Sequence, residues 1–308
     1  MHCRLLIQLA AVVALVAAAA LPQVAHAAAG SNNWAVIIST SRYWHNYRHT
    51  ANALSMYHIL KSNGISDDRI VLMMSDSHAC DPRNDRPAQI FNNKDNKINL
   101  YGCDAQVDFN AYETDIQAAL STLQGRYDEN TPISRQLRSD ENSSVLVYIT
   151  GHGGENFIKF QDQEYLSNED IAQTIAVMAA QKRFKNLLFV AETCHAQSLC
   201  AHVDTPNVVC VASALTEEDT YSHHMNAALG VWAIDMFTFY TLQFFQNTPK
   251  AQDVPLQKWV ESYDPKVLHS TVNWKGLSEY GADWRIGDFF GNGKGGGWKP
   301  VAIQEDLF

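Results

Sequence analysis

The chain has 308 residues, and 46% of them are hydrophobic, which is enough for the packed core of one large domain or two small ones. Its formal net charge is -10, and its 23 lysines and arginines form no basic block, so composition argues against a nucleic-acid-binding surface. We therefore expect proteins or small molecules as partners.

The N-terminus predicts a signal peptide over residues 1–27. Arg4 precedes an apolar run over 5–21, and Ala25, His26 and Ala27 then give the small-x-small pattern of a cleavage site. An N-terminal membrane anchor is the alternative, although the alanine-rich run is short and only weakly hydrophobic. We expect no transmembrane helix after it, because residues 227–245, the nearest later candidate, contain Asp235 and predict a buried helix.

Five short apolar runs predict buried strands, and helical patterns lie between most of them. The runs are 33–40, 69–74, 144–150, 187–191 and 208–212, and the helical patterns are 51–60, 112–123 and 168–182. Gly64 is placed to end the first helix, and Ser167 with Asp170 is placed to cap the third. Alternating strands and helices predict an α/β fold with a largely parallel sheet covered on both faces.

The remaining segments set the predicted domain boundaries. Residues 77–110 are rich in Asp, Asn, Pro and Lys and predict a long excursion from the core. After residue 247 the apolar pattern weakens, and glycines fill 291–297. We predict a catalytic domain over 28–250 and a C-terminal extension over 251–308 with a glycine-rich tail and no transmembrane helix.

Two of the predicted strands end in reactive side chains. Gly151, His152 and Gly153 follow the 144–150 strand, and Thr193 and Cys194 follow the 187–191 strand. Ligands of open α/β sheets bind at the carboxyl ends of strands. An imidazole there can take the thiol proton during nucleophilic attack and return it to a leaving amine. The Gly153 and Cys194 N–H groups could hold the oxygen that becomes negative. The pattern indicates acyl transfer by a cysteine nucleophile.

Two other interpretations of these residues remain open. Cys194 could be a packed thiol at a strand end, with His152 an ordinary loop residue. A zinc site built from His152, Cys194, His195, Cys200 and His202 is the other interpretation, but no C-x-x-C or H-x-x-x-H spacing supports it. After removal of a signal peptide that contains Cys3, five cysteines remain, so at least one is free or bonded to another chain.

Several separate segments, in order, resemble the catalytic subunits of GPI transamidases, within the caspase and legumain group of cysteine proteases. They are NNWAV at 32–36, TSRYW at 40–44, NYRH at 46–49, ACDPRN at 79–84, TGHGG at 150–154, KFQD at 159–162 and DFFG at 288–291. The resemblance implies a caspase-like three-layer sandwich. Two residues depart from the usual Asp-Thr-Cys-Gln of this family, since the chain has Glu192 and His195 at its ends.

The resemblance also implies an activity and its residues. Such enzymes cut the C-terminal signal from a proprotein through a cysteine thioester and transfer the new end to the ethanolamine amine of a GPI glycolipid. Cys194 would be the nucleophile, His152 the acid and base, and Asn46 the residue that orients His152. Asn46 could instead cap the helix that starts near Thr50. Arg48 and Thr220 match substrate-contacting positions.

Further expectations from the resemblance concern ions, partners and location. No cofactor is required for the chemistry, but a structural calcium ion is implied at Asp67, the Ile70 carbonyl, Gln106 and Asp108, with a solvated acidic loop as the alternative. Cys80 matches a cysteine that links to a partner subunit, and a Cys80–Cys103 bridge is the alternative. Membrane-embedded transamidase subunits would then hold the chain at the membrane of the endoplasmic reticulum, on its lumenal side.

Two competing functions also fit the sequence. A legumain-like asparaginyl endopeptidase would use water in place of the amine, and the segment with Asn46, Arg48 and His49 is common to both groups. A non-catalytic scaffold would keep the fold for partner binding alone.

Overall fold

The computed structural model describes residues 32–102, 105–248 and 250–292, so the predicted signal peptide and the glycine-rich tail after residue 292 lie outside the described residues. The strands are β1 (Asn33–Ser39), β2 (Ile70–Met74), β3 (Phe109–Asn110), β4 (Ser144–Thr150), β5 (Gly153–Gly154), β6 (Phe157–Phe160), β7 (Glu164–Ser167), β8 (Asn186–Glu192), β9 (Val208–Ala212), β10 (Ser222–Asn226), β11 (Val231–Asp235) and β12 (Asn273–Lys275).

The α-helices are α2 (Tyr47–Ser62), α3 (Ile116–Gln124), α4 (Asn168–Ala180), α5 (Met236–Asn247), α6 (Leu256–Val260), α7 (Pro265–Leu268), α8 (Leu277–Tyr280) and α9 (Gly287–Phe290). Short 3-10 helices are η1 (Trp44–Asn46), η2 (Asp67–Arg69), η3 (His78–Cys80), η4 (Ala111–Glu113), η5 (Ile133–Arg135), η6 (Ala196–Cys200) and η7 (Ala251–Asp253).

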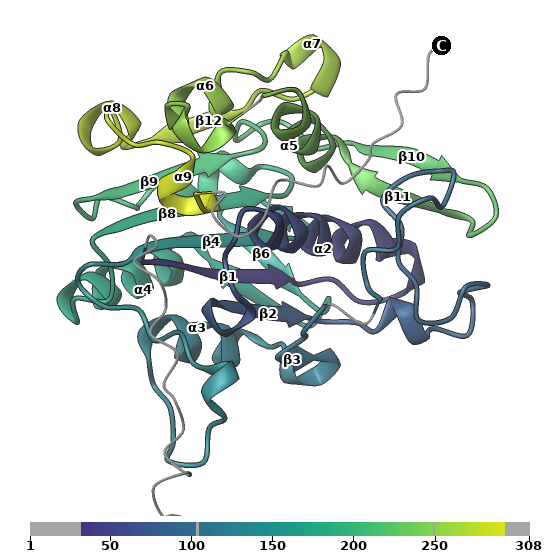
Figure 1. The fold of residues 1–308 in the computed structure, drawn as a ribbon, viewed down its shortest axis with the longest axis horizontal. Helices are drawn as coiled ribbons and strands as arrows, with labels where there is room; N and C mark the ends of the chain where they lie inside the picture. The colour runs from purple at the N-terminus through teal and green to yellow at the C-terminus, as the bar shows by residue number, and fades with distance from the viewer. Residues whose placement is uncertain (1–31, 103–104, 249, 293–308) are drawn as a thin grey trace, which may run out of the picture. The chain divides into compact units, whose positions relative to one another are not determined.

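A mostly parallel sheet forms the centre of the fold. Among the described residues its order is β12-β9-β8-β4-β1-β2-β3, and only β12 runs antiparallel to its neighbour (Figure 1). All five predicted strands are present within a residue or so of the predicted ends. The β5-β6-β7 and β10-β11 strands form two smaller antiparallel sheets.

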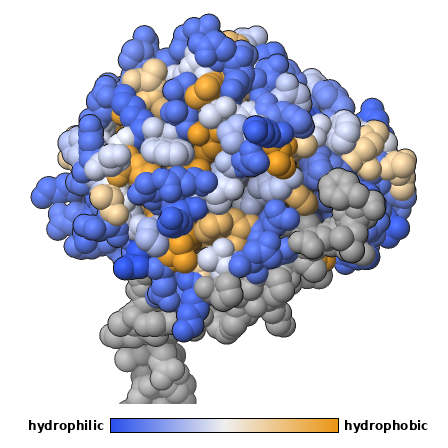
Figure 2. Space-filling model, turned by 90° about the horizontal axis from the view of Figure 1, so that it is seen from above, coloured by the Kyte–Doolittle hydropathy of each residue, from blue (hydrophilic) through white to orange (hydrophobic). Residues whose placement is uncertain are grey.

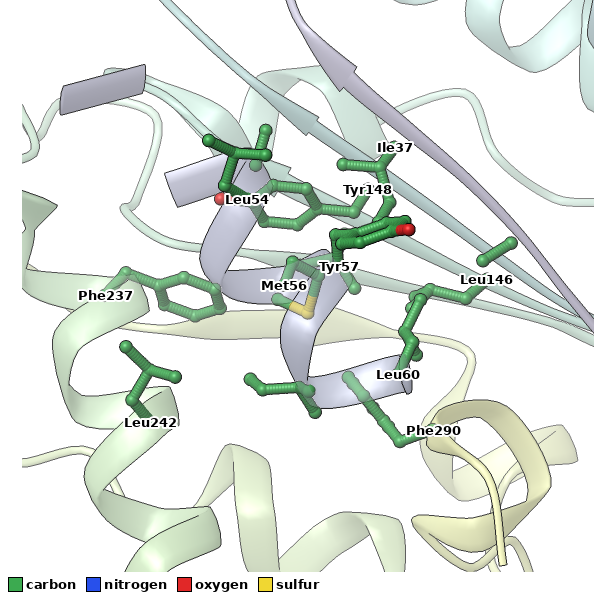
Figure 3. Close-up of a cluster of buried hydrophobic side chains, with 14 of the residues drawn as sticks. Ile37, Leu54, Met56, Tyr57, Leu60, Leu146, Tyr148, Phe237, Leu242 and Phe290 are labelled. Carbon is green, nitrogen blue, oxygen red and sulfur yellow. The ribbon is translucent and has the colours of Figure 1, made fainter. Parts of the chain in front are cut away.

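Helices cover both faces of the central sheet, because successive strand residues point to opposite faces. On one face, Ile37 and Tyr148 pack in a core with α2, α5 and the helices after them. Figure 3 shows Leu54, Met56 and Leu60 of α2 in this core, near Phe237 of α5 and Phe290 of α9. On the other face, Val36 and Val147 pack with α3, α4 and η6. The predicted three-layer α/β arrangement is confirmed.

The predicted helix ends are mostly confirmed. Gly64 follows the end of α2 with φ 88°, a conformation that glycine adopts without steric cost. The Ser167 side chain accepts a hydrogen bond from the Asp170 backbone, and the capping box at the start of α4 is complete. The α2 helix begins earlier than predicted, at Tyr47, directly after Asn46.

The predicted single helix over 227–245 is wrong. Its first half is a turn and strand β11, which pairs with β10, and helix α5 begins only at Met236. Gly230 has φ 69°, so the chain reverses direction there. Asp235 marks the junction, because its buried carboxylate accepts hydrogen bonds from α2 side chains. Apolar content alone could not distinguish a buried strand plus helix from one helix.

Residues after 250 join the central fold. Strand β12 adds an edge to the sheet, with Trp274 opposite Val211. Helix α9 packs on β1 and β4, and Asn33 in β1 donates its side-chain amide to the Gly287 carbonyl. On the face over α5–α8 seen in Figure 2, hydrophobic residues appear in separate groups among hydrophilic ones.

In the described ranges, every helix is too short or too polar to cross a membrane.

Candidate active site

The loops that carry His152 and Cys194 lie side by side. Strands β4 and β8 are parallel neighbours, with Thr150 opposite Glu192, so both loops leave the same edge of the sheet. The Gly151 N–H donates to the Glu192 carbonyl at 3.3 Å. A Cβ atom on Gly153 would lie 2.4 Å from the Thr193 hydroxyl and 3.2 Å from the Cys194 carbonyl. Only glycine allows this approach of the two loops.

Asn46 holds the His152 ring in one orientation. Its Oδ1 lies 2.7 Å from His152 Nε2, and its amide nitrogen donates to the Arg42 carbonyl at 2.6 Å. The amide oxygen is therefore the acceptor, so Nε2 carries the ring proton and Nδ1 keeps a lone pair. Asn46 stands at the N-cap position of α2, but its side chain makes no capping hydrogen bond. The Asn46 side chain therefore bonds His152 and does not cap the helix.

The His152 ring is neutral at neutral pH. Burial lowers its pKa to about 4, and the positive charge of Arg48 adds to the effect. The His49 ring packs edge-on against it at 5.0 Å between ring centres. A neutral imidazole with a free Nδ1 is a base that can accept a proton.

The Cys194 thiol is also neutral. Its Sγ accepts a hydrogen bond from the Thr220 N–H at 3.4 Å and lies 3.7 Å from the Thr220 hydroxyl. Burial raises the pKa of this thiol above its ordinary value, and the nearby Asp219 carboxylate also raises it. Within the described residues, Thr220 and the Asp219 carboxylate are the hydrogen-bond partners of Sγ, and no hydrogen bond joins Sγ to His152.

The two adjoining loops each carry a backbone N–H group without a partner among the described residues, at Gly153 and at Cys194. The Lys159 N–H donates to the His152 carbonyl at 2.8 Å, and Gly153 faces Ile158 in the same antiparallel pair. Hydrogen-bonded and non-bonded pairs alternate in such strands, so the Gly153 N–H points away from β6. The Cys194 N–H has no hydrogen-bond partner in the described part of the chain. Both donors are available to a carbonyl oxygen at the thiol.

Comparison with known protein families shows which family has this sequence pattern. The sequence pattern of the peptidase C13 family matches residues 33–284. The chain belongs to the peptidase C13 family.

Relatives in other organisms carry a more specific name. A "GPI-anchor transamidase" of Schizosaccharomyces pombe is 44% identical over 265 residues, which are 85% of this chain and 70% of the relative. A "GPI-anchor transamidase" of Homo sapiens is 44% identical over 217 residues, which are 70% of this chain and 55% of the relative. The chain thus spans little more than half of the human relative. Among solved structures, a caspase-1 from Spodoptera frugiperda is similar with a TM-score of 0.45 and 9% identity, over 80% of this chain and 88% of that chain.

In this peptidase C13 chain, Arg48 lies in a partly buried ion pair with Asp235. Its Nε donates to Asp235 Oδ1 at 3.0 Å, and its guanidinium also donates to the His45 carbonyl at 3.1 Å. The other Asp235 oxygen accepts from Asn52 at 2.6 Å and lies 3.6 Å from His49. Arg48 therefore lies close enough to His152 to affect its charge. Most of the Arg48 guanidinium is already bonded to protein groups.

Glu192 and His195, the two departures from the usual motif, have different surroundings. Glu192 is buried and accepts hydrogen bonds from the Thr238 N–H at 3.0 Å and from the Tyr148 and Thr238 hydroxyls. Burial and the charge of Asp235 raise the pKa of Glu192 to about 8. His195 has φ 56°, and its ring bonds the Thr216 carbonyl and lies 3.7 Å from Asp219. The Glu192 side chain is buried, whereas the His195 side chain is partly exposed and lies near Asp219, a neighbour of the Cys194 thiol.

The cysteines contradict the zinc interpretation. Cys200 and Cys210 form a disulfide bond, which removes one of its thiolates. Across the described residues, no group of three or more His, Cys, Asp or Glu side chains could hold a metal ion. Sequence reasoning missed this disulfide, because a spacing of ten residues carries no signature of its own. Cys80 is exposed and free, while Cys103 lies outside the described residues.

The residues predicted to bind calcium gather at the start of β2, away from the thiol. Gln106 donates to Asp67 at 3.3 Å, and Asp108 accepts from the Leu72 N–H at 3.0 Å. Burial, with the charge of Asp67, raises the pKa of Asp108 to about 6. Asp67 also accepts hydrogen bonds from the Tyr57 hydroxyl and the Lys61 ammonium. Carboxylate and amide oxygens are donor types that calcium takes, and in this structure the Lys61 ammonium already pairs with Asp67.

Proposed function

We propose that this chain is the catalytic subunit of a GPI transamidase that uses a Cys194 thioester. The observation that carries the proposal is the meeting of the Cys194 and His152 loops, which bring the free N–H groups of Gly153 and Cys194 onto the same edge of the sheet. The peptidase C13 match and the relatives named GPI-anchor transamidase support the reaction class and the amine acceptor.

The first half of the proposed reaction forms the thioester. Cys194 Sγ attacks the carbonyl carbon of the attachment residue, and the thiol proton moves to His152 Nδ1. The Gly153 and Cys194 N–H groups hold the oxyanion, each contributing about 3 kcal/mol in comparable acyl transfers. The C–N bond then breaks, and His152 gives its proton to the leaving amine of the signal peptide.

The second half transfers the acyl group. The ethanolamine amine of the glycolipid attacks the thioester carbon, and His152 takes the amine proton. The C–S bond breaks, the new amide is released, and the proton returns to the thiolate. A neutral His152 suits both steps, because it must accept a proton in each.

Neighbouring residues support this chemistry in distinct ways. Asn46 orients His152 by fixing which ring nitrogen carries the proton. Thr220 holds Sγ in place at the substrate side. Arg48 lowers the pKa of His152 and, together with its partner Asp235, borders the site where the attachment residue would lie.

The proposed setting is the lumen of the endoplasmic reticulum. The Cys200–Cys210 disulfide supports an oxidising compartment. Membrane-embedded subunits would hold the chain at the membrane, and the exposed Cys80 thiol is available for a disulfide bond to one of them.

A structural calcium ion belongs to the same proposal. Asp67, the Ile70 carbonyl, Gln106 and Asp108 would hold it and so tie the start of β2 to the loop before β3. Adding calcium should raise the melting temperature of the chain by a few degrees, and Asp108→Ala should abolish that rise. An equal rise in Asp108→Ala would contradict the assignment.

The experiment on function uses cells that lack their own catalytic subunit. The wild-type chain should restore surface display of a GPI-anchored reporter, and Cys194→Ala should not. Cys194→Ala cells that display the reporter would refute the proposal. If the purified chain instead cleaved peptides after Asn rapidly without partner subunits, an asparaginyl endopeptidase would be the better assignment.

A further inference from the structure

The connection from β8 to β9 contains no α-helix, although it begins with the nucleophile. The crossovers from β1 to β2 and from β4 to β8 contain the α-helices α2 and α4, whereas this connection contains only the 3-10 helix η6. Short 3-10 helices have poor hydrogen-bond geometry and little stability of their own. The position of Cys194 therefore depends on tertiary contacts of η6.

A disulfide bond provides one of these contacts. It joins Cys200, the last residue of η6, to Cys210 in the middle of β9, with the Cα atoms 5.8 Å apart. Both residues are buried, with 4% and 1% of their surface exposed, in the core beneath η6. The bond fixes the far end of the segment that starts at Cys194 to the central sheet.

Ser198 in η6 connects this helix to the two loops that carry the oxyanion donors. The Ser198 hydroxyl donates to the His195 carbonyl at 2.7 Å and accepts from the Asn156 N–H at 2.8 Å. His195 directly follows Cys194, and Asn156 lies in the turn of the β5-β6 hairpin that carries Gly153. One hydroxyl on η6 thus connects the Cys194 loop with the Gly153 hairpin.

We propose that the Cys200–Cys210 disulfide positions the two oxyanion donors by fixing η6. The inference rests on the proposed acyl transfer at Cys194. An oxyanion hole works only when its donors are aligned before the charge develops, so small shifts of η6 would slow the chemical step. Substrate binding and the intrinsic reactivity of the thiol would change little.

The test compares acylation with alkylation of the same thiol. Iodoacetamide reacts by displacement at a saturated carbon and forms no oxyanion, whereas a signal-bearing peptide does. We expect kcat for acyl transfer by the Cys200→Ala/Cys210→Ala variant in its assembled complex to fall about 10-fold. Complete loss of one oxyanion donor would lower kcat by more than this. The KM and the iodoacetamide rate at Cys194 should stay within about 2-fold of the wild type.

A second variant covers the case in which the double variant does not fold. Ser198→Ala keeps the disulfide and the backbone bond from Ser198 to the His195 carbonyl, but it removes the hydroxyl that bonds both Asn156 and His195, so it should show the same selective loss of kcat. Ser278→Ala, an exposed serine on α8, is the matched control. An unchanged kcat in folded variants would overturn the inference and leave the proposed function intact. A proportional loss of alkylation would also overturn it, whereas a wild type without acyl transfer would refute the proposed function itself.

Discussion

At the scale of single residues, the thiol and the imidazole form a neutral pair. Burial lowers the pKa of His152 to about 4 and raises the pKa of Cys194, which favours the neutral pair over a thiolate–imidazolium pair at neutral pH. We predict that the iodoacetamide rate at Cys194 keeps rising above about pH 9, where an ordinary thiol begins to level off. The rate is measured by mass spectrometry of the modified peptide. A plateau below pH 7 would show a preformed ion pair.

Asn46 provides a second residue-scale prediction. Asn46→Ala leaves His152 Nε2 without its buried acceptor, which costs about 1–3 kcal/mol, so kcat should fall about 5- to 150-fold with KM nearly unchanged. Asn63→Ala, at the other end of α2, is the control. If Asn46 only supported the helix, the variant would lower the melting temperature without this selective loss of kcat.

The sequence alone predicts part of this site. Strand ends and flanking glycines indicated His152 and Cys194, and the family resemblance indicated Asn46. The surroundings of Glu192 and His195 could not be predicted, because they depend on Tyr148, Thr238 and Thr216, which come from distant parts of the chain. Burial of Asp235 beside Arg48 depends in the same way on the position of β11 against α2.

At the scale of elements, two glycines provide a matched pair of substitutions. Gly276 has φ 84° between β12 and α8, and an added Cβ would lie 2.3 Å from the Val208 carbonyl oxygen. Gly230 has φ 69° in the β10-β11 turn, where an added Cβ would meet no atom within 4 Å.

In both variants the alanine must adopt a left-handed backbone, which costs about 1–2 kcal/mol. Because Gly230→Ala creates no clash, its unfolding free energy should fall by this amount alone. The clash in Gly276→Ala adds more, for a total of about 3 kcal/mol or above. Urea unfolding of both variants measures the difference. Equal losses would mean that β12 does not pack closely on β9.

The main elements of the sheet were predictable, because a buried parallel strand needs a continuous apolar run. The short β3, β5 and β12 strands were not, because two or three residues carry no periodicity. The junction of β11 with α5 was missed for a related reason. Both elements are apolar on several sides, so only the pairing with β10 separates them.

At the scale of the whole molecule, buried Glu192 links stability to pH. Its pKa is raised to about 8 by burial and by Asp235, so the folded chain holds a proton that the unfolded chain releases above about pH 4.5. This contribution to stability is complete at low pH and is lost as the pH rises through about 8. We predict a smaller fall in melting temperature between pH 6 and 9 for Glu192→Gln than for the wild type. Glu279→Gln, at an exposed position, should behave as the wild type.

The central claim is that Cys194 forms a thioester that an amine then opens. The most direct measurement is mass spectrometry of the products formed from a signal-bearing peptide by the assembled complex in the presence of hydrazine. We predict a hydrazide at the new C-terminus, with no product from Cys194→Ala. Only the free acid, at every hydrazine concentration, would contradict transamidation and indicate a hydrolase.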